Sequence, residues 1–121
     1  MKRNHRSLKA WQLGMDLVEQ VYAVTRGFPK EEMFGLTGQM RRAAISVPTN
    51  IAEGCARSST KELLRFLAIS AGSLSELDTH VAIAQRLGYL KDSKLLDGID
   101  EVSAVLMGLG ASLRRKLNLS T

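Results

Sequence analysis

The fold is decided by one stretch of the chain, QMRRAAISVPTNIAEGCARSSTKE, which runs from Gln39 to Glu62. Its second half contains a capping box, in which the Ser59 side chain accepts a hydrogen bond from the amide of Glu62 and starts a new helix at Thr60. Its first half has apolar residues at helical spacing around Pro48. The stretch therefore predicts two helices joined by a tight turn.

Pro48 leaves two interpretations of the first of these helices. A proline inside a helix removes one backbone hydrogen bond and costs about 3 kcal/mol, which favours a helix that ends before the proline and restarts after it. The apolar positions, however, keep the helical period across the proline, and Ser46, Thr49 and Asn50 carry side chains that can bond the freed backbone groups. We therefore predict one kinked helix over residues 34–56.

The other three helices, the one that begins at Thr60 among them, are predicted from apolar residues at amphipathic helical spacing and from the caps and stops beside them. They span residues 8–26, 60–87 and 93–118, and Ser7 is the expected cap of the first. Because the loops between them are short, consecutive helices should run antiparallel. The predicted fold class is all-α, an up-down-up-down antiparallel four-helix bundle that forms a single domain over residues 1–121.

The last predicted helix contains three glycines, each of which costs about 1 kcal/mol relative to alanine in a helix interior. We therefore expect another helix to approach closely at these positions, which are Gly98, Gly108 and Gly110.

The composition favours a helical protein in a reducing compartment. Hydrophobic residues make up 45% of the 121 residues and aromatic residues only 5%, so an aliphatic core is expected. Cys55 is the only cysteine, which excludes an internal disulfide and a Cys-x-x-Cys motif. No apolar run reaches the roughly 18 residues of a membrane span, and the basic N-terminus leads into an amphipathic helix instead of the apolar block of a signal peptide. We expect a cytoplasmic protein without a membrane partner.

No catalytic motif stands out, and we expect a protein that is not an enzyme and that uses no metal or cofactor. Di-iron bundles need Glu-x-x-His pairs, whereas Glu76 and His80 are four residues apart and have no second copy. Cys55 and His80 fall far apart on antiparallel helices, so a Cys-His nucleophile is not expected either.

Three long motifs carry a resemblance to a known family. They are LKAWQLGMDLVEQVY at Leu8 to Tyr22, FPKEEMFGLTGQMRRAAISVPTNIAEG at Phe28 to Gly54, and SSTKELLRFLAISAGSLSELDT at Ser58 to Thr79. In these motifs the chain resembles the four-helix bundle proteins first noted as products of intervening sequences within bacterial 23S ribosomal RNA genes. The resemblance implies a bacterial protein with the same bundle, assembled as a ring-shaped homopentamer, whose biochemical function is poorly defined.

The chain is also similar to the accessory protein of diversity-generating retroelements. That similarity implies a basic pentameric barrel that binds nucleic acid and associates with a reverse transcriptase. The two resemblances therefore imply three kinds of partner: further copies of this chain, RNA or DNA, and a protein such as a reverse transcriptase.

Ten basic residues are predicted to gather at one end of the bundle, which we call the basic end. The start of the first helix, the turn at residues 57–59 and the end of the last helix share this end in an up-down-up-down bundle. One interpretation is a surface that binds nucleic-acid phosphates without reading bases; the other is a solvated charged face. The ten residues are Lys2, Arg3, Arg6, Lys9, Arg57, Lys61, Arg65, Arg114, Arg115 and Lys116.

A set of polar residues lies along the two central helices. Arg41 and Arg42 are expected within about one turn of Glu76, which predicts an ion pair from one of these arginines to Glu76. The set is either a structural polar network or subunit interface, or a ligand site. Its members are Arg41, Arg42, Ser46, Asn50, Glu53, Ser73, Glu76 and His80.

The sequence and the resemblance together predict a non-enzymatic, oligomeric, RNA-associated protein that binds nucleic acid through the basic end. The net charge of +5 agrees with such a partner. The alternative is a structural protein–protein interaction module, such as an accessory subunit of a reverse transcriptase.

Overall fold

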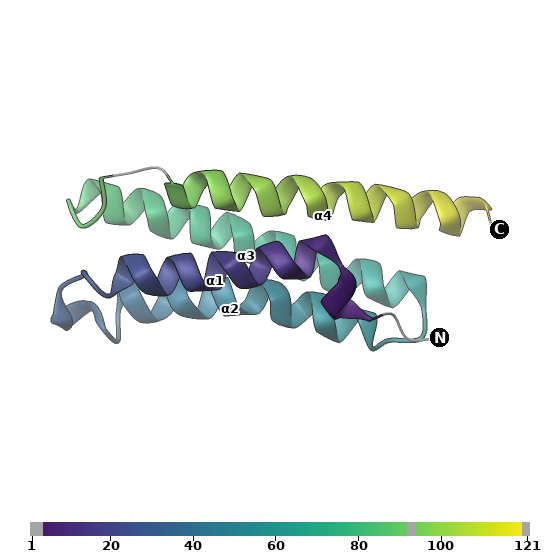
Figure 1. Ribbon diagram of the computed structural model, residues 1–121, viewed down its shortest axis with the longest axis horizontal. Coiled ribbons are helices and arrows are strands. Elements are labelled where there is room, and N and C mark those ends of the chain that lie inside the picture. The colour runs from purple at the N-terminus through teal and green to yellow at the C-terminus, as the bar shows by residue number, and fades with distance from the viewer. Residues whose placement is uncertain (1–3, 92–93, 120–121) are drawn as a thin grey trace.

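The computed structural model describes residues 4–91 and 94–119 and is shown in Figure 1. Figure 1 shows long helices side by side, with consecutive helices antiparallel. The all-α class is confirmed, and the arrangement agrees with the predicted four-helix bundle. In the described part of the chain the elements are four α-helices and two short 3-10 helices, without a strand: η1 (His5–Ser7), α1 (Lys9–Thr25), η2 (Lys30–Glu32), α2 (Leu36–Cys55), α3 (Thr60–Arg86) and α4 (Lys94–Leu119).

The helix ends differ from the predicted ones by a few residues, for local reasons. Ser7 does not cap α1, because its hydroxyl donates to the carbonyl of Asn4, the residue that caps η1. α2 begins at Leu36, whose amide donates to the Glu32 side chain. The cap of α3 is confirmed, since Ser59 Oγ accepts from the Glu62 amide at 3.1 Å. The predicted start of the last helix, at residue 93, lies outside the described residues.

The core is aliphatic and receives side chains from all four α-helices. Each α-helix packs against two others: α1 and α3 both contact α2 and α4. Among the largest fully buried side chains are Leu17, Met40, Ile51, Leu77 and Leu113. Within the described residues, no helix combines the length and the apolar character that a membrane crossing needs.

α2 runs without interruption through Pro48, so the single-helix interpretation is confirmed. Side chains donate hydrogen bonds to three consecutive carbonyls just before the proline ring. Thr49 donates to the Ile45 carbonyl at 2.7 Å, and Asn50 donates to the Ser46 carbonyl at 2.9 Å. The third donor comes from another helix: Ser70 Oγ of α3 lies 2.8 Å from the carbonyl of Val47, in a buried position.

Close approach between helices occurs at some glycines and not at others. A Cβ at Gly54 would lie 2.8 Å from Leu63 Cδ1 and 2.9 Å from Phe66 Cβ, so α2 and α3 are in contact there. A Cβ at Gly98 would lie 2.7 Å from Gln20 Oε1 of α1, as predicted for this glycine.

The prediction that another helix approaches closely is wrong for the other two glycines of α4, as far as contacts within a single copy of the protein are concerned. Gly108 has nothing within 4 Å of a built Cβ, and the three atoms nearest to a Cβ at Gly110 belong to Arg114 on its own helix.

His80 is a buried polar side chain on α3. It is 5% exposed, and its Nδ1 atom has no hydrogen-bond partner among the described residues. Its Nε2 atom lies 3.7 Å from Oε2 of Glu76, one turn earlier and exposed. Burial lowers the pKa of His80, because it disfavours the charged ring, and the Glu76 carboxylate opposes this shift in part.

We predict opposite effects of one substitution at two glycines. Gly108→Ala should stabilise the protein by about 1 kcal/mol, because alanine favours helix and the position is open. Gly54→Ala should destabilise it by about 1–2 kcal/mol, because overpacking between α2 and α3 outweighs the same gain. Urea unfolding of both variants measures the difference. Equal stabilisation by the two variants would contradict a tight contact between α2 and α3 at Gly54.

We also predict that stability falls as the solution becomes acidic, through His80. The unfolded chain takes up a proton near pH 6.5, whereas the folded protein does so only at lower pH. This contribution to stability is therefore complete above about pH 6.5 and is lost below it, with a slope of at most about 1.4 kcal/mol per pH unit. His80→Leu should flatten this part of the profile in urea unfolding at several pH values. An unchanged slope in that variant would contradict the prediction.

Candidate nucleic-acid interface

The elements that carry the basic end lie together in space. Figure 1 shows the start of α1, the turn between α2 and α3, and the end of α4 at the same end of the molecule. Lys2 and Arg3 lie outside the described residues. The other eight predicted residues are all exposed: Arg6, Lys9, Arg57, Lys61, Arg65, Arg114, Arg115 and Lys116.

Two arginines of the basic end flank the ring of Phe66 on α3. The guanidinium carbons of Arg57 and Arg65 lie 4.9 Å and 4.6 Å from the ring centroid. Such cation–π contacts hold the charged groups over a buried aromatic side chain while leaving them open to solvent. The two arginines therefore lie at neighbouring positions, Arg57 in the turn between α2 and α3 and Arg65 in α3.

Carboxylates also hold these two arginines. Arg57 Nη2 lies 3.3 Å from Glu53 Oε2, and Arg65 Nε lies 3.0 Å from Glu62 Oε2. The hydrogen bond from Arg65, followed by its positive charge, lowers the pKa of Glu62. A guanidinium has five N–H donors, so each arginine keeps donors for a further anion. Both pairs are exposed and contribute little to stability.

At the N-terminal part of the basic end, Arg6 and its neighbour His5 pack against Trp11 of α1. The guanidinium carbon of Arg6 lies 5.4 Å from the Trp11 ring centroid, and the His5 ring meets the indole edge-to-face at 5.3 Å. Gln12 donates to the Arg6 carbonyl at 2.9 Å. Aromatic rings thus lie against cations of the basic end at two places. Sequence reasoning did not single out Trp11 and Phe66, although their closeness to arginines along the chain was a signal for both.

The predicted polar set divides into a network and separate contacts. Ser46 of α2 and Ser73 of α3 share a hydrogen bond of 2.8 Å between their hydroxyls, and Asn50 donates to Ser46 Oγ at 2.9 Å. These three residues link α2 to α3, as expected of a structural network. Glu53 instead pairs with Arg57 of the basic end.

The predicted ion pair from Arg41 or Arg42 to Glu76 is wrong. Arg41 turns toward α1, where its Nε donates to Thr25 Oγ1 at 2.9 Å and its guanidinium lies 4.4 Å from the Tyr22 ring centroid. A hydroxyl acceptor and an aromatic face satisfy Arg41 there. Arg42 is exposed and makes no ion pair with Glu76.

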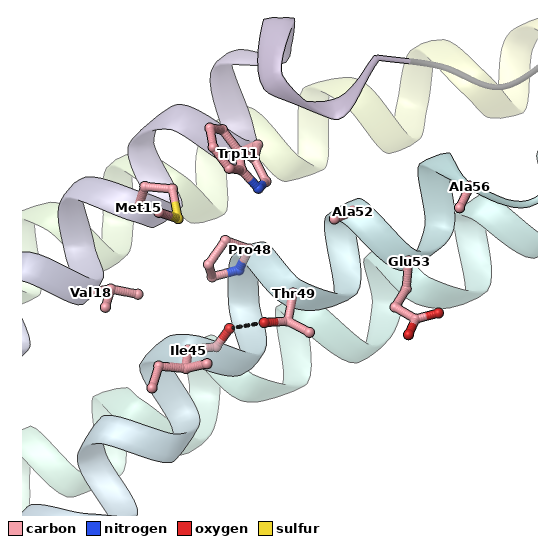
Figure 2. A pocket seen from close by; sticks show the side chains of 9 residues that line it. All are labelled: Trp11, Met15, Val18, Ile45, Pro48, Thr49, Ala52, Glu53 and Ala56. Carbon is pink, nitrogen blue, oxygen red and sulfur yellow. Dashed lines mark hydrogen bonds between the residues drawn. The ribbon is translucent and has the colours of Figure 1, made fainter.

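An apolar groove opens between α1 and α2 beside the basic end. Its volume is about 620 Å³. Figure 2 shows the Trp11 indole and Pro48 on opposite sides of it, with Thr49 and Glu53 as its polar groups. We call this feature the α1–α2 groove; it is lined by Trp11, Met15, Val18, Ile45, Pro48, Thr49, Ala52, Glu53 and Ala56.

Comparison with known proteins agrees with the resemblance seen in the sequence. No curated protein matches the chain. The model of the family described as 23S rRNA-intervening sequence protein matches residues 6–108, which include the first three α-helices and more than half of α4. Because this match covers most of the 121 residues, the chain belongs to the family of 23S rRNA-intervening sequence proteins.

Proposed function

We propose that this protein is a non-enzymatic nucleic-acid-binding protein that holds a phosphate backbone on its basic end. The observation that supports this most is the gathering of eight exposed cations from three segments that are distant in sequence. Lysine and arginine side chains that replace counterions supply most of the affinity in sequence-independent binding. RNA is the first nucleic acid to test, because the family is named for an intervening sequence of ribosomal RNA.

The proposal includes self-association, with a ring-shaped homopentamer as the expected form. One flank of α3 exposes apolar side chains, with Ile69 and Ile83 about 40% exposed and Leu87 more so. Ile69 lies one turn before Ser73, whose hydroxyl donates to the Ile69 carbonyl and bonds Ser46, so an interface along this flank would cover both apolar and polar groups. In a ring, the basic ends repeat around the axis and their electrostatic fields add.

A second candidate function is a protein–protein interaction module, such as an accessory subunit of a reverse transcriptase. It is favoured by Phe34, which is 95% exposed beside the half-exposed Met33. This pair lies in the loop between α1 and α2, at the end of the molecule away from the basic end. Aromatic residues exposed in this way are typical of sites that bind another protein.

The first test compares two triple variants with equal changes of charge. Replacement of Arg114, Arg115 and Lys116 by alanine removes three cations from the basic end. We expect weaker RNA binding and a salt slope, the slope of log K against log salt concentration, that is shallower by up to about 2 for single-stranded RNA. Fluorescence anisotropy with labelled RNA at several salt concentrations measures both quantities.

The matched control replaces Lys30, Lys91 and Lys94 by alanine, which are exposed lysines at the opposite end of the molecule. It should leave the salt slope unchanged. Equal losses in both triple variants would indicate an effect of net charge alone. If the natural sequence bound neither RNA nor DNA at low salt, the proposed nucleic-acid binding would be contradicted. The protein–protein interaction module would then be the remaining candidate function.

The second test concerns the oligomer. Size-exclusion chromatography with light scattering should give a mass several times 13.3 kDa. Ile83→Glu should lower that mass, because it places a charge on the apolar flank of α3. Ala82→Glu adds the same charge at the next, exposed position on another side of the helix and should not change the mass. A monomer of the natural sequence at micromolar concentration would contradict self-association.

A further inference from the structure

We propose that the α1–α2 groove binds an unpaired base of a single-stranded nucleic acid, stacked on Trp11, while the basic end holds the flanking phosphates. This inference rests on the proposed nucleic-acid binding and specifies its form. It assigns single strands, or the unpaired parts of folded RNA, as the preferred ligand over a continuous duplex.

The shape and lining of the groove suit a flat apolar ring. Its volume of about 620 Å³ lies within the range of about 300–1,000 Å³ that is typical of small-molecule sites. Most of its lining is apolar, and the rigid ring of Pro48 faces the Trp11 indole across it, as Figure 2 shows. A base placed between them would have an aromatic surface on one side and an aliphatic surface on the other.

Unpaired bases can use such a site and paired bases cannot. Proteins that bind single strands stack successive bases on aromatic side chains, and this contact tolerates any base because each has a π-face. In a duplex the faces of the bases are already stacked on their neighbours, so a groove on a protein surface cannot reach them.

The charges around the groove favour a nucleic acid over an uncharged apolar ligand. Arg6 lies against Trp11 at one side of the groove, with its guanidinium carbon 5.4 Å from the ring centroid. Arg57 directly follows Ala56, which lines the groove on α2, and its guanidinium reaches Glu53 at the rim. A strand that places one base in the groove therefore has cations available for the phosphates on either side of that base.

The polar groups at the rim leave room for hydrogen bonds to a base. Thr49 uses its hydroxyl hydrogen toward the Ile45 carbonyl, so its oxygen remains an acceptor. Glu53 contacts Arg57 through Oε2 at 3.3 Å and retains its other oxygen. The Thr49 and Glu53 oxygens can both accept hydrogen bonds from amino or imino groups of a base. We expect these bonds to orient the base, while stacking and phosphate contacts supply the affinity.

The test uses the full chain, a short single-stranded RNA and the same RNA annealed to its complement. Trp11 is the only tryptophan, so its fluorescence reports on the groove directly. We expect the single strand to change this fluorescence and to bind more tightly than the duplex. Ala52→Leu, which fills the groove without changing charge, should weaken single-strand binding about fivefold or more and leave duplex binding unchanged.

The matched control is Ala104→Leu, which adds the same side chain at an exposed position of α4 outside the groove. It should leave both affinities unchanged. Trp11→Leu provides a second variant, with circular dichroism to confirm folding, and should produce a loss similar to that of Ala52→Leu.

Three results would overturn the inference. Equal binding of both RNAs, with constant fluorescence and no effect of Ala52→Leu, would leave the proposed function intact and exclude the groove. A change of oligomer mass in Ala52→Leu would show that a second copy of this chain occupies the groove. Absence of binding to both RNAs would overturn the inference together with the proposed function.

Discussion

The structure depends on how α2 accommodates Pro48. The proline ring removes one amide donor from the helix, and a helix with such a break would be expected to bend or end. The three carbonyls that directly precede the proline accept hydrogen bonds from hydroxyl and amide side chains, and one of these donors, Ser70, comes from α3. The contact with Ser70 is buried, so it ties the proline turn of α2 to the middle of α3 and sets the register between these two helices.

The same turn of α2 also determines the contact with α1. A Cβ built at Gly14 would lie 3.5 Å from the Pro48 ring, within van der Waals contact, so α1 and α2 approach each other closely at the proline. Beyond this contact the helices leave the α1–α2 groove open beside Trp11. The turn of α2 at Pro48 thus contacts α1 on one side, next to the groove, and α3 on the other. The position of the basic end follows from where the α2–α3 hairpin turns.

Much of this arrangement was predictable from the sequence because it depends on local spacing. The unbroken apolar period across Pro48 indicated one helix, and the spacing of Ser59 and Glu62 indicated the start of the next. Once four helices alternate in direction, the gathering of the basic segments follows from their order along the chain. No knowledge of side-chain packing was needed for these predictions.

Properties that depend on the rotation and separation of the helices were not predictable. The spacing of Arg41 permits contacts with α1 or with α3, and only the packing shows that Thr25 and Tyr22 of α1 receive it. Gly98 and Gly108 have the same intrinsic helix propensity, yet a neighbouring helix comes close only to Gly98. Similarly, an amphipathic pattern places Trp11 toward the interior but does not reveal a groove beside it.

The central claim is that the basic end carries the contacts with nucleic acid. It is tested most directly by ultraviolet crosslinking of the intact protein to RNA at low salt, followed by mass spectrometry of the crosslinked peptides. The account predicts crosslinks in peptides from the first turns of α1, from the α2–α3 turn and from the end of α4. Crosslinks confined to the α1–α2 and α3–α4 loops, at the other end of the molecule, would contradict it.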